Sequence, residues 1–513
     1  MRSVRVLKNV LTNYARFFLG GVLGIVLTPI MVHLLGDHDY GLWVTVFSLT
    51  GYFGLFDQGI RPSLVRYVSR DHARGDREGL ERTVNTALAL FGGLGVVALG
   101  VTAVVAANFA HWFHIDAASV AMTTRVVWIA GVAVALGFPL GVFGAVLSGL
   151  QRYDLGNGIG IAVAIVRALA FVVVLRLGGG LVALAWASLA MNLVGHAVSW
   201  ILAQRVLPGI RYGLRYVTRD HLGLIGGYST ISFVGALANS ITFQTDALVI
   251  TAMLGAALVT PFAIAAGLVE NVRALVYSAT YVLAPTASEL ETRGETDKLH
   301  ALMIAGAKYS VLLSWPVLFG LLVFGENFLV TWVGEKYRTA FPLLVTLTVP
   351  TLLSLPQATA GALLFGVSRH KGMVAISVAN ALVNLGLSIA LAHPLGLFGV
   401  ALGTAVPLAL LGGVATLVYA CRALGLGLTT YLDRGLLRPG LLTLAFAIPA
   451  AALRLTWNPT GWVPIAVACG ACWLAFAACA WRWGITGAER DRWGRMVPGL
   501  FGRAVAAAPV RET

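Results

Sequence analysis

Arg74-Gly75-Asp76, with Leu80 four residues after the aspartate, returns 219 residues later as Arg293-Gly294-Glu295 with Leu299. Further pairs at nearly the same offset are Leu35-Gly36 with Leu254-Gly255, Asn108-Phe109 with Asn327-Phe328, Gly149 with Gly366, and Arg152 with Arg369. Separated matches at offsets of 217 to 219 are not expected by chance. They indicate that the chain contains two homologous halves.

The composition is that of a membrane protein. Of the 513 residues, 58% are hydrophobic and only 11% are charged, and the 59 glycines suit closely packed transmembrane helices. Apolar runs long enough to cross about 30 Å of hydrocarbon recur throughout the chain. They lie near 9–35, 40–65, 83–107, 121–149, 155–176, 181–203, 223–250, 256–283, 301–325, 340–366, 373–392, 396–421, 438–456 and 461–481. The expected fold is therefore all-α, a polytopic membrane protein with about 14 transmembrane helices.

The duplication divides this plan into two pseudo-symmetric bundles of six helices. We expect an N-terminal bundle at 1–204, a cytoplasmic linker at 205–222, a second bundle at 223–421, two additional transmembrane helices at 422–481 and a basic tail at 482–513. Membrane proteins with two homologous halves commonly bind their substrate near the middle of the bilayer, where the halves meet. The first functional expectation is therefore a secondary transporter.

The distribution of Lys and Arg predicts the orientation, because cytoplasmic loops carry the excess of these residues. Of the 36 basic residues, 26 fall in the terminal segments and in loops on one predicted side of the membrane. Only Arg176, Lys336, Arg338 and Arg454 fall on the other side. Both termini are thus expected in the cytoplasm. Contact with anionic lipid headgroups explains the net charge of +14 without a nucleic acid partner.

Motifs of enzymatic chemistry are not recognisable in the sequence. It has no Gly-rich phosphate loop, no H-E-x-x-H, no G-x-S-x-G and no pair of acids at a loop, which excludes ATP hydrolysis by this chain. A Ser, His and Asp triad stays open, because its members need not be adjacent. Cys469, Cys472 and Cys479 share the last apolar run without an acid or histidine, so a packed apolar role is favoured over a metal site.

A few charges lie inside the apolar runs, where each costs about 2.5–3.5 kcal/mol near a helix centre. Arg16 shares a helix face with Asn13 in the first run. Asp57 and Arg61 lie one turn apart in the second run. In the eighth run, Glu270 and Arg273 lie one turn apart, with Tyr277 on the same face. Because the duplication pairs the first two runs with the seventh and eighth, we expect these residues to line one central cavity.

Two interpretations of these charges stay open. The acid and base of each pair can simply neutralise one another within their helix. Six basic residues nevertheless lie in the apolar runs, against the three acids Asp57, Asp246 and Glu270, so complete pairing leaves a positive cavity. The planar fork of arginine binds phosphate oxygens in pairs, which favours a diphosphate headgroup as the ligand.

Part of the sequence is similar to a known family. The residues that carry the likeness are Leu35-Gly36, Tyr40-Gly41-Leu42-Trp43, Asp57-Gln58-Gly59-Ile60, Arg66-Tyr67 and Arg74-Gly75-Asp76. They resemble the N-terminal region of bacterial polysaccharide and O-antigen-type flippases, members of the multidrug/oligosaccharidyl-lipid/polysaccharide (MOP) exporter superfamily. The segment plan and the repeat extend the likeness over about residues 5–420.

The resemblance implies a flippase that moves a polyprenyl-diphosphate-linked oligosaccharide across the bacterial cytoplasmic membrane by alternating access, without covalent chemistry. It also implies contacts with other membrane proteins of polysaccharide assembly. In the related lipid II flippases, cavity arginines in the first, second and eighth helices match Arg16, Arg61 and Arg273 approximately in position. The identity of the sugar does not transfer with this match.

The same resemblance suggests coupling to Na⁺ or H⁺, with no other cofactor. Lipid II flippases have a cation site formed by the seventh, eleventh and twelfth helices, and Asp246, Asn380, Asn384 and Thr404 occupy comparable places here. The family pattern prefers an acid where this chain has Asn384, so Asp246 is the only carboxylate among these four residues. Cation affinity is expected to be lower because the ligands carry less negative charge. The alternative is that the two asparagines only hydrogen-bond neighbouring helices.

Two rival functions are a multidrug exporter of the same superfamily and a membrane-embedded polysaccharide polymerase or ligase. A drug exporter would use acids to bind lipophilic cations, which the excess of buried arginine disfavours. A polymerase or ligase would be expected to carry a large outward loop with catalytic residues. The predicted outward connections are short throughout.

Overall fold

The structure is a computed structural model that describes all residues except 1, 219, 223–229, 281 and 486–513. The side chains of 2–11, 14, 56–59 and 230–232 also lie outside the description. The described residues are almost entirely helical and form no β-strand, as expected for a chain whose backbone must satisfy its own hydrogen bonds in lipid. Most of the predicted tail, 486–513, falls outside the described residues.

The helices follow the predicted apolar runs. The N-terminal half forms α1 (Arg2–Gly51), α2 (Gly54–Arg74), α3 (Arg77–Trp112), α4 (Ala117–Gly149), α5 (Tyr153–Arg176) and α6 (Gly180–Val206), followed by the short turn η1 (Leu214–Tyr216). The next elements are α8 (Thr230–Leu254), η2 (Ala256–Leu258), α9 (Val259–Thr280), α10 (Leu283–Thr292), α11 (Thr296–Val333), η3 (Glu335–Ala340), α12 (Phe341–Ser354) and α13 (Gln357–Gly366). The remainder forms α14 (Lys371–Pro407), η4 (Leu408–Ala415), α15 (Thr416–Leu424), α16 (Leu428–Tyr431), η5 (Leu432–Leu437), α17 (Arg438–Thr456), α18 (Trp462–Cys479) and η6 (Ala480–Gly484).

Eleven helical segments of the described chain are long and apolar enough to cross a membrane, or up to 12 if the bent pair Glu335–Ser354 and Gln357–Gly366 is one span. The expected number of about fourteen separate transmembrane helices is not confirmed. The difference arises because Ala15–Gly51 and Lys371–Leu424 each contain two predicted runs. Each has non-helical backbone at one glycine, Gly36 and Gly396, where the two runs meet. The protein is a multi-pass helical membrane protein.

The contacts between residues divide the chain into two compact units. The first comprises 1–271, 332–347 and 371–412, and the second comprises 272–331, 348–370 and 413–513. These units do not follow the consecutive boundaries that we expect from the sequence, and those boundaries stay a prediction.

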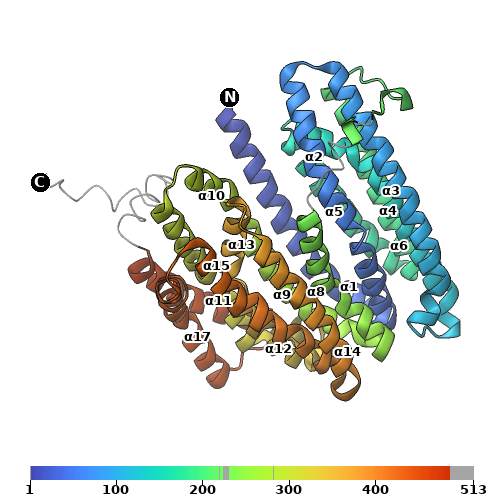
Figure 1. The fold of residues 1–513 in the computed structure, drawn as a ribbon. Coiled ribbons are helices and arrows are strands. Elements are labelled where there is room, and N and C mark those ends of the chain that lie inside the picture. The colour runs from blue at the N-terminus through green and yellow to red at the C-terminus, as the bar shows by residue number, and fades with distance from the viewer. Residues whose placement is uncertain (1, 219, 223–229, 281, 486–513) are drawn as a thin grey trace, which may run out of the picture. The chain divides into compact units, whose positions relative to one another are not determined.

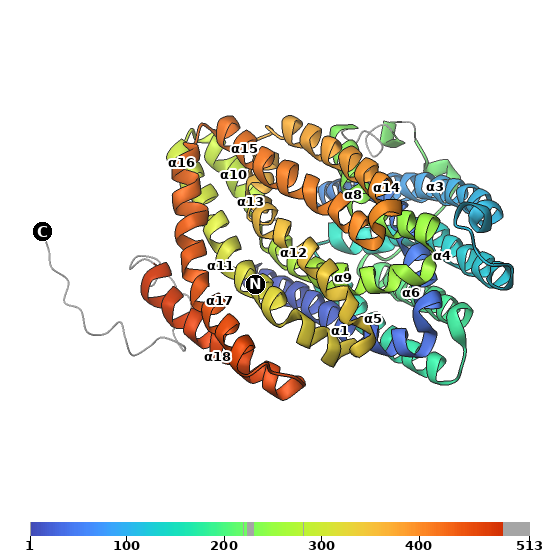
Figure 2. The ribbon, with the colours of Figure 1, turned by 90° about the horizontal axis from the view of Figure 1, so that it is seen from below.

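The core of the first unit lies between its long helices. Leu64, Phe91 and Leu147 belong to a buried cluster that joins α2, α3 and α4. Leu42, Phe109 and other residues form a second cluster that joins α1, α3, α4, α5 and α6. Figures 1 and 2 show α3, α4 and α6 side by side within this unit. The helices thereby bury a shared apolar seam.

The C-terminal helices pack onto α11 in the second unit. Phe324 of α11, Phe446 of α17 and Phe476 of α18 share a buried cluster with Cys472, while Cys469 packs against it. The cysteines thus act as small apolar residues in this core. Figure 2 shows α17 and α18 next to one another.

The internal repeat is visible in the backbone. Gly75 ends α2 in the left-handed conformation at φ 68°, and Gly294 follows α10 at φ 70°. A residue with a side chain adopts this conformation only with strain, so both halves keep glycine after the helix. Gly36 and Gly255, the other repeated glycine pair, also have positive φ, 78° and 99°.

Candidate functional site

Asp246 is at the centre of a buried polar cluster between α8 and α14, both within the first unit. Thr404 Oγ1 donates a hydrogen bond of 2.7 Å to Asp246 Oδ2, and Asn384 Nδ2 donates one of 2.8 Å to Thr404 Oγ1. Asn380 Nδ2 donates 3.1 Å to Thr242 Oγ1, one turn before Asp246 on α8. The structure therefore brings together the four residues of the predicted ion site.

Three oxygens of this cluster have no hydrogen-bond partner among the described residues: Asp246 Oδ1, Asn380 Oδ1 and Asn384 Oδ1. Asp246 is 5% exposed and Asn384 is fully buried, so solvent does not satisfy these atoms. Buried polar atoms without a partner are uncommon and often mark an ion, a water or a proton that completes the site. Carboxylate, amide and hydroxyl oxygens are the ligand types that hard monovalent and divalent cations use.

The glycines of α14 bring the two limbs of this helix together. Gly396 leaves the helical conformation at φ 57°, between Asn384 and Thr404. On the second limb, a Cβ at Gly399 would lie 2.0 Å from the carbonyl oxygen of Leu391, and one at Gly403 would lie 2.4 Å from Ser388 Oγ. The limbs therefore pack backbone to backbone, which places Thr404 within hydrogen-bond distance of Asn384.

Arg16 and Arg61 lie against glycine-containing faces of the N-terminal bundle. A Cβ placed on Gly160 of α5 would lie 2.7 Å from Arg16 Nε. A Cβ placed on Gly144 of α4 would lie 3.6 Å from Arg61 Nη2, and one placed on Gly141 would lie 3.9 Å from it. Both arginines are exposed, so their guanidinium groups can meet a ligand from the accessible face of the bundle.

His196 of α6 lies near Arg61 and was not predicted from the sequence. Its imidazole is close enough to Arg61 to interact with it electrostatically, and a Cβ on Gly137 would lie 3.7 Å from His196 Nε2. Gly137, Gly141 and Gly144 recur at helical spacing on α4. This glycine face leaves space for a large side chain of a neighbouring helix, but the sequence alone does not show which helix supplies it.

The other predicted cavity residues have different environments. Asn13 is exposed on α1, and the side chain of Asp57 lies outside the described residues. On α9, Glu270 is exposed, Arg273 is 8% exposed and Tyr277 is 49% exposed. The guanidinium carbon of Arg273 lies 5.7 Å from the centre of the Tyr277 ring, a cation–π distance.

Arg16 and Arg61 belong to the first compact unit, whereas Arg273 belongs to the second. A common cavity for the three arginines stays a prediction.

A half-buried ion pair between Glu326 and Arg454 also escaped the sequence analysis, which counted Arg454 on the non-cytoplasmic side. Arg454 Nη2 donates 2.6 Å to Glu326 Oε2, and each side chain is about a quarter exposed, at 25% and 24%. The pair attaches α17 to α11 within the second unit. Such pairing is the usual condition for charges within membrane segments.

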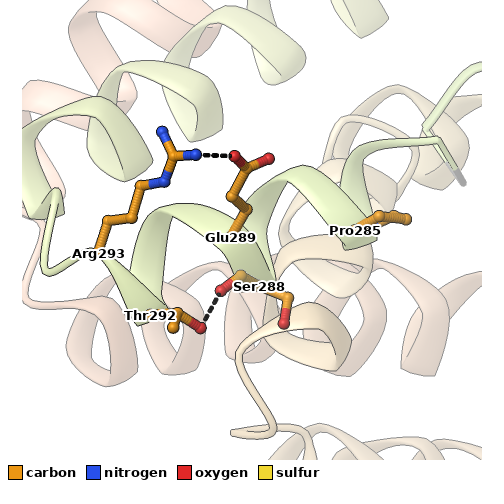
Figure 3. A pocket seen from close by; sticks show the side chains of 5 residues that line it. All are labelled: Pro285, Ser288, Glu289, Thr292 and Arg293. Atoms are coloured by element: carbon orange, nitrogen blue, oxygen red, sulfur yellow. Dashed lines mark hydrogen bonds and ion pairs between the residues drawn. The ribbon is translucent and has the colours of Figure 1, made fainter.

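A surface pocket lies over α10 and is lined by Pro285, Ser288, Glu289, Thr292 and Arg293 (Figure 3). Arg293 Nη2 pairs with Glu289 Oε1 at 2.6 Å, and Thr292 Oγ1 donates 2.8 Å to the carbonyl oxygen of Ser288. The arginine in this pocket is thus neutralised by an acid one turn away. The pocket does not share the basic character of the Arg16 and Arg61 face.

The polysaccharide biosynthesis protein family model matches residues 30–342 of the chain. The chain belongs to this family. It is also 24% identical over 428 residues to the uncharacterized membrane protein EpsK of Bacillus subtilis (strain 168), covering 81% of this chain and 83% of that protein.

Two solved structures show that the family member has the fold of MOP superfamily transporters. The lipid II flippase MurJ in an inward closed conformation aligns with a TM-score of 0.69 and 12% identity, over 95% of this chain and 100% of that one. The inward-facing structure of a multidrug resistance MATE family transporter of the MOP superfamily aligns with a TM-score of 0.65 and 16% identity, over 81% of this chain and 95% of that one. The fold expected from the resemblance is confirmed.

Proposed function

We propose that the protein is a flippase that moves a polyprenyl-diphosphate-linked glycan across the bacterial cytoplasmic membrane for cell-surface polysaccharide synthesis. The family match and the transporter fold support the class of protein. The observation that supports this substrate is the placement of two arginines, Arg16 and Arg61, against glycines of α5 and α4 in the N-terminal bundle. Two guanidinium groups bind diphosphate oxygens by charge-assisted hydrogen bonds, while the prenyl chain stays in lipid.

The same arginines disfavour the multidrug alternative. A lipophilic cation would be repelled by Arg16 and Arg61, which both belong to the first unit. Exporters of cations are expected to bind their substrates with acids. In the N-terminal bundle the glycines of α4 and α5 instead accommodate two arginines.

Transport would proceed by alternating access as a secondary transporter, with both termini in the cytoplasm. The chemistry needs no covalent step, because only the environment of the diphosphate changes between the two faces of the membrane. The Asp246 cluster is the candidate site for the driving ion. A carboxylate in hydrocarbon requires a proton or a cation as its counter-charge, and either one can bias a conformational equilibrium.

Deletion of the gene tests the proposed substrate class. We expect a polyprenyl-diphosphate-linked oligosaccharide to accumulate on the cytoplasmic face, identified by mass spectrometry of extracted lipids. Wild-type protein should remove this accumulation, and Arg61→Ala should not. Unchanged lipid-linked glycan together with reduced efflux of cationic dyes would instead identify a multidrug exporter.

A further inference from the structure

The peptide that leaves α6 is fixed to the first turns of α3 through its main chain. Arg77 Nη2 donates to the carbonyl oxygens of Pro208 and Gly209, at 3.1 Å and 2.7 Å. One turn later, Glu81 Oε1 accepts a hydrogen bond of 3.1 Å from the amide of Arg211. Side chains four residues apart on α3 thus hold successive peptide groups of this segment.

Asn85, one further turn along α3, completes the attachment. Its Nδ2 donates 2.8 Å to the carbonyl oxygen of Arg211, and its Oδ1 accepts 2.9 Å from the amide of Gly213. Glu81 and Asn85 are 7% and 5% exposed, so these hydrogen bonds are shielded from water. A buried side chain that satisfies both ends of its amide positions the peptide firmly.

The side chains of the same segment face outward. Arg211 and Arg215 are exposed, Tyr212 is 45% exposed and Leu214 is 83% exposed. The guanidinium of Arg215 lies 4.8 Å from the centre of the Tyr216 ring and donates 2.9 Å to its hydroxyl. The α3 attachment therefore uses the main chain and leaves the two arginines and Leu214 exposed. Tyr212 is partly engaged, because its hydroxyl accepts from Gln204 Nε2 and its ring contacts Phe143.

The second half shows that the attachment does not need these side chains. His300 occupies the repeat position of Glu81, and its Nε2 lies 2.7 Å from the carbonyl oxygen of Leu424, at the end of α15. The peptide that follows is Gly425-Leu426-Gly427, which has neither arginine nor tyrosine. Main-chain capture of the departing peptide is thus common to both halves. The equivalent second-half segment, 424–435, carries one arginine, Arg434, next to Asp433, and its Tyr431 is buried, whereas the first-half segment carries three arginines and no acid.

We propose that residues 205–216, the linker anchor, form a binding surface for anionic phospholipid headgroups of the cytoplasmic leaflet. The anchor contains Arg205, Arg211 and Arg215 and no acid. The acids at the start of α3 are engaged: Glu81 accepts from the amide of Arg211, Asp76 Oδ1 accepts 2.8 Å from the amide of Gly79, and Glu78 pairs with Arg82. Arginine with tyrosine and an exposed leucine is the combination that suits a headgroup layer, where charge meets phosphate and apolar atoms enter the acyl boundary.

Fluorescence quenching in nanodiscs tests this proposal on the full chain. A fluorophore is attached at Leu214→Cys in a protein whose four cysteines are replaced by alanine, and brominated lipids serve as quenchers. We expect brominated phosphatidylglycerol to quench at least about twofold more than brominated phosphatidylcholine. The double variant Arg211→Gln/Arg215→Gln should lose this difference.

Two matched variants separate lipid binding from general charge and from folding. Arg293→Gln/Lys298→Gln removes two exposed charges elsewhere and should keep the preference for phosphatidylglycerol. Asn85→Ala releases the main chain of the anchor and should weaken quenching by both lipids although the arginines remain. Equal quenching by the two lipids, no quenching, or a preference that survives loss of Arg211 and Arg215 would overturn the proposal. The assay contains no glycan, so its failure would leave the proposed transport function untouched.

Discussion

Thr404 donates a hydrogen bond of 2.7 Å to Asp246, joining α14 to α8 at the centre of a buried polar cluster. The hydroxyls of Thr404 and Ser388 hydrogen-bond this carboxylate. A hydroxyl orients a carboxylate without neutralising it. The cluster is therefore suited to take up a proton or a cation. The side-chain oxygens of Asn380 and Asn384 on α14 can act as further ligands for a cation.

Asp246→Asn should uncouple transport from its driving ion. The amide keeps the shape of the side chain but can neither titrate nor carry the negative charge. Coupling energies of about 1–3 kcal/mol correspond to a loss of about 5- to 150-fold in the ion-driven rate. The measurement is translocation in proteoliposomes under an imposed sodium or pH gradient. A normal rate in Asp246→Asn, with neither gradient having an effect on wild type, would show that Asp246 is structural.

Asn384→Ala distinguishes the two ions. Sodium uses oxygen ligands, so removal of this amide should raise the sodium concentration needed for half-maximal transport. A proton requires only the acid, and under proton coupling the variant should transport nearly as wild type. Ser377→Ala is the matched control on the same helix, because Ser377 hydrogen-bonds the carbonyl oxygen of Met373 and not the cluster.

Replacing Arg16, Arg61 or Arg273 with alanine should abolish translocation at unchanged protein level. Each loses charge-assisted hydrogen bonds worth about 1.5–3 kcal/mol, or roughly 10- to 150-fold in affinity for a diphosphate. Lysine should rescue in part, since it keeps the charge but not the two-pronged geometry. Binding of the lipid-linked glycan and its transport are both measured. Full activity of all three alanine variants would remove the support for an anionic substrate.

The repeated glycines Gly149 and Gly366 should be needed for packing. A Cβ on Gly149 would lie 2.7 Å from Val68 Cγ1, and one on Gly366 would lie 2.2 Å from the carbonyl oxygen of Ala284. Overpacking of this kind costs about 1–3 kcal/mol. Alanine at either position should lower the thermal midpoint, more at Gly366, where the neighbour is backbone. Gly92→Ala is the control, since its Cβ would meet nothing within 4 Å.

Orientation is tested with cysteines on opposite predicted sides. A cysteine at Arg293, in the turn between α10 and α11, should resist a membrane-impermeant thiol reagent in intact cells and react after permeabilisation. A cysteine at the exposed Ala118 should react in both conditions. The reverse pattern would place the termini outside and contradict the charge-based topology.

Most of the fold follows from the sequence, because long apolar runs can satisfy their backbone in lipid only as helices. The repeated glycines Gly36, Gly75, Gly255 and Gly294 all have positive φ and lie where helices end or bend. The number of separate helices could not be predicted from the sequence. Helices joined at Gly36 and Gly396 continue through a single distorted residue, and periodicity does not distinguish such a break from a loop.

The ion cluster was predicted in composition but its geometry was not. The resemblance placed Asp246, Asn380, Asn384 and Thr404 together. Hydrogen bonds join Asn384 to Thr404 and Thr404 to Asp246, while Asn380 bonds Thr242 of the same helix as Asp246. An ion-binding role for these residues stays a prediction. His196 and the Glu326–Arg454 pair were missed, because each depends on contacts between helices distant in sequence. The common cavity of Arg16, Arg61 and Arg273 stays a prediction.

Reconstituted transport tests the central claim most directly. Proteoliposomes containing a polyprenyl-diphosphate-linked glycan are exposed to a membrane-impermeant glycosidase, and the cleaved fraction is followed over time. With wild-type protein under an ion gradient, the fraction should rise beyond the outer-leaflet pool until the lipid is consumed. With Arg61→Ala it should stop at that pool, as in protein-free vesicles. Cleavage that stops at the outer-leaflet pool with wild-type protein, in vesicles where it is folded and the gradient is intact, would contradict the account.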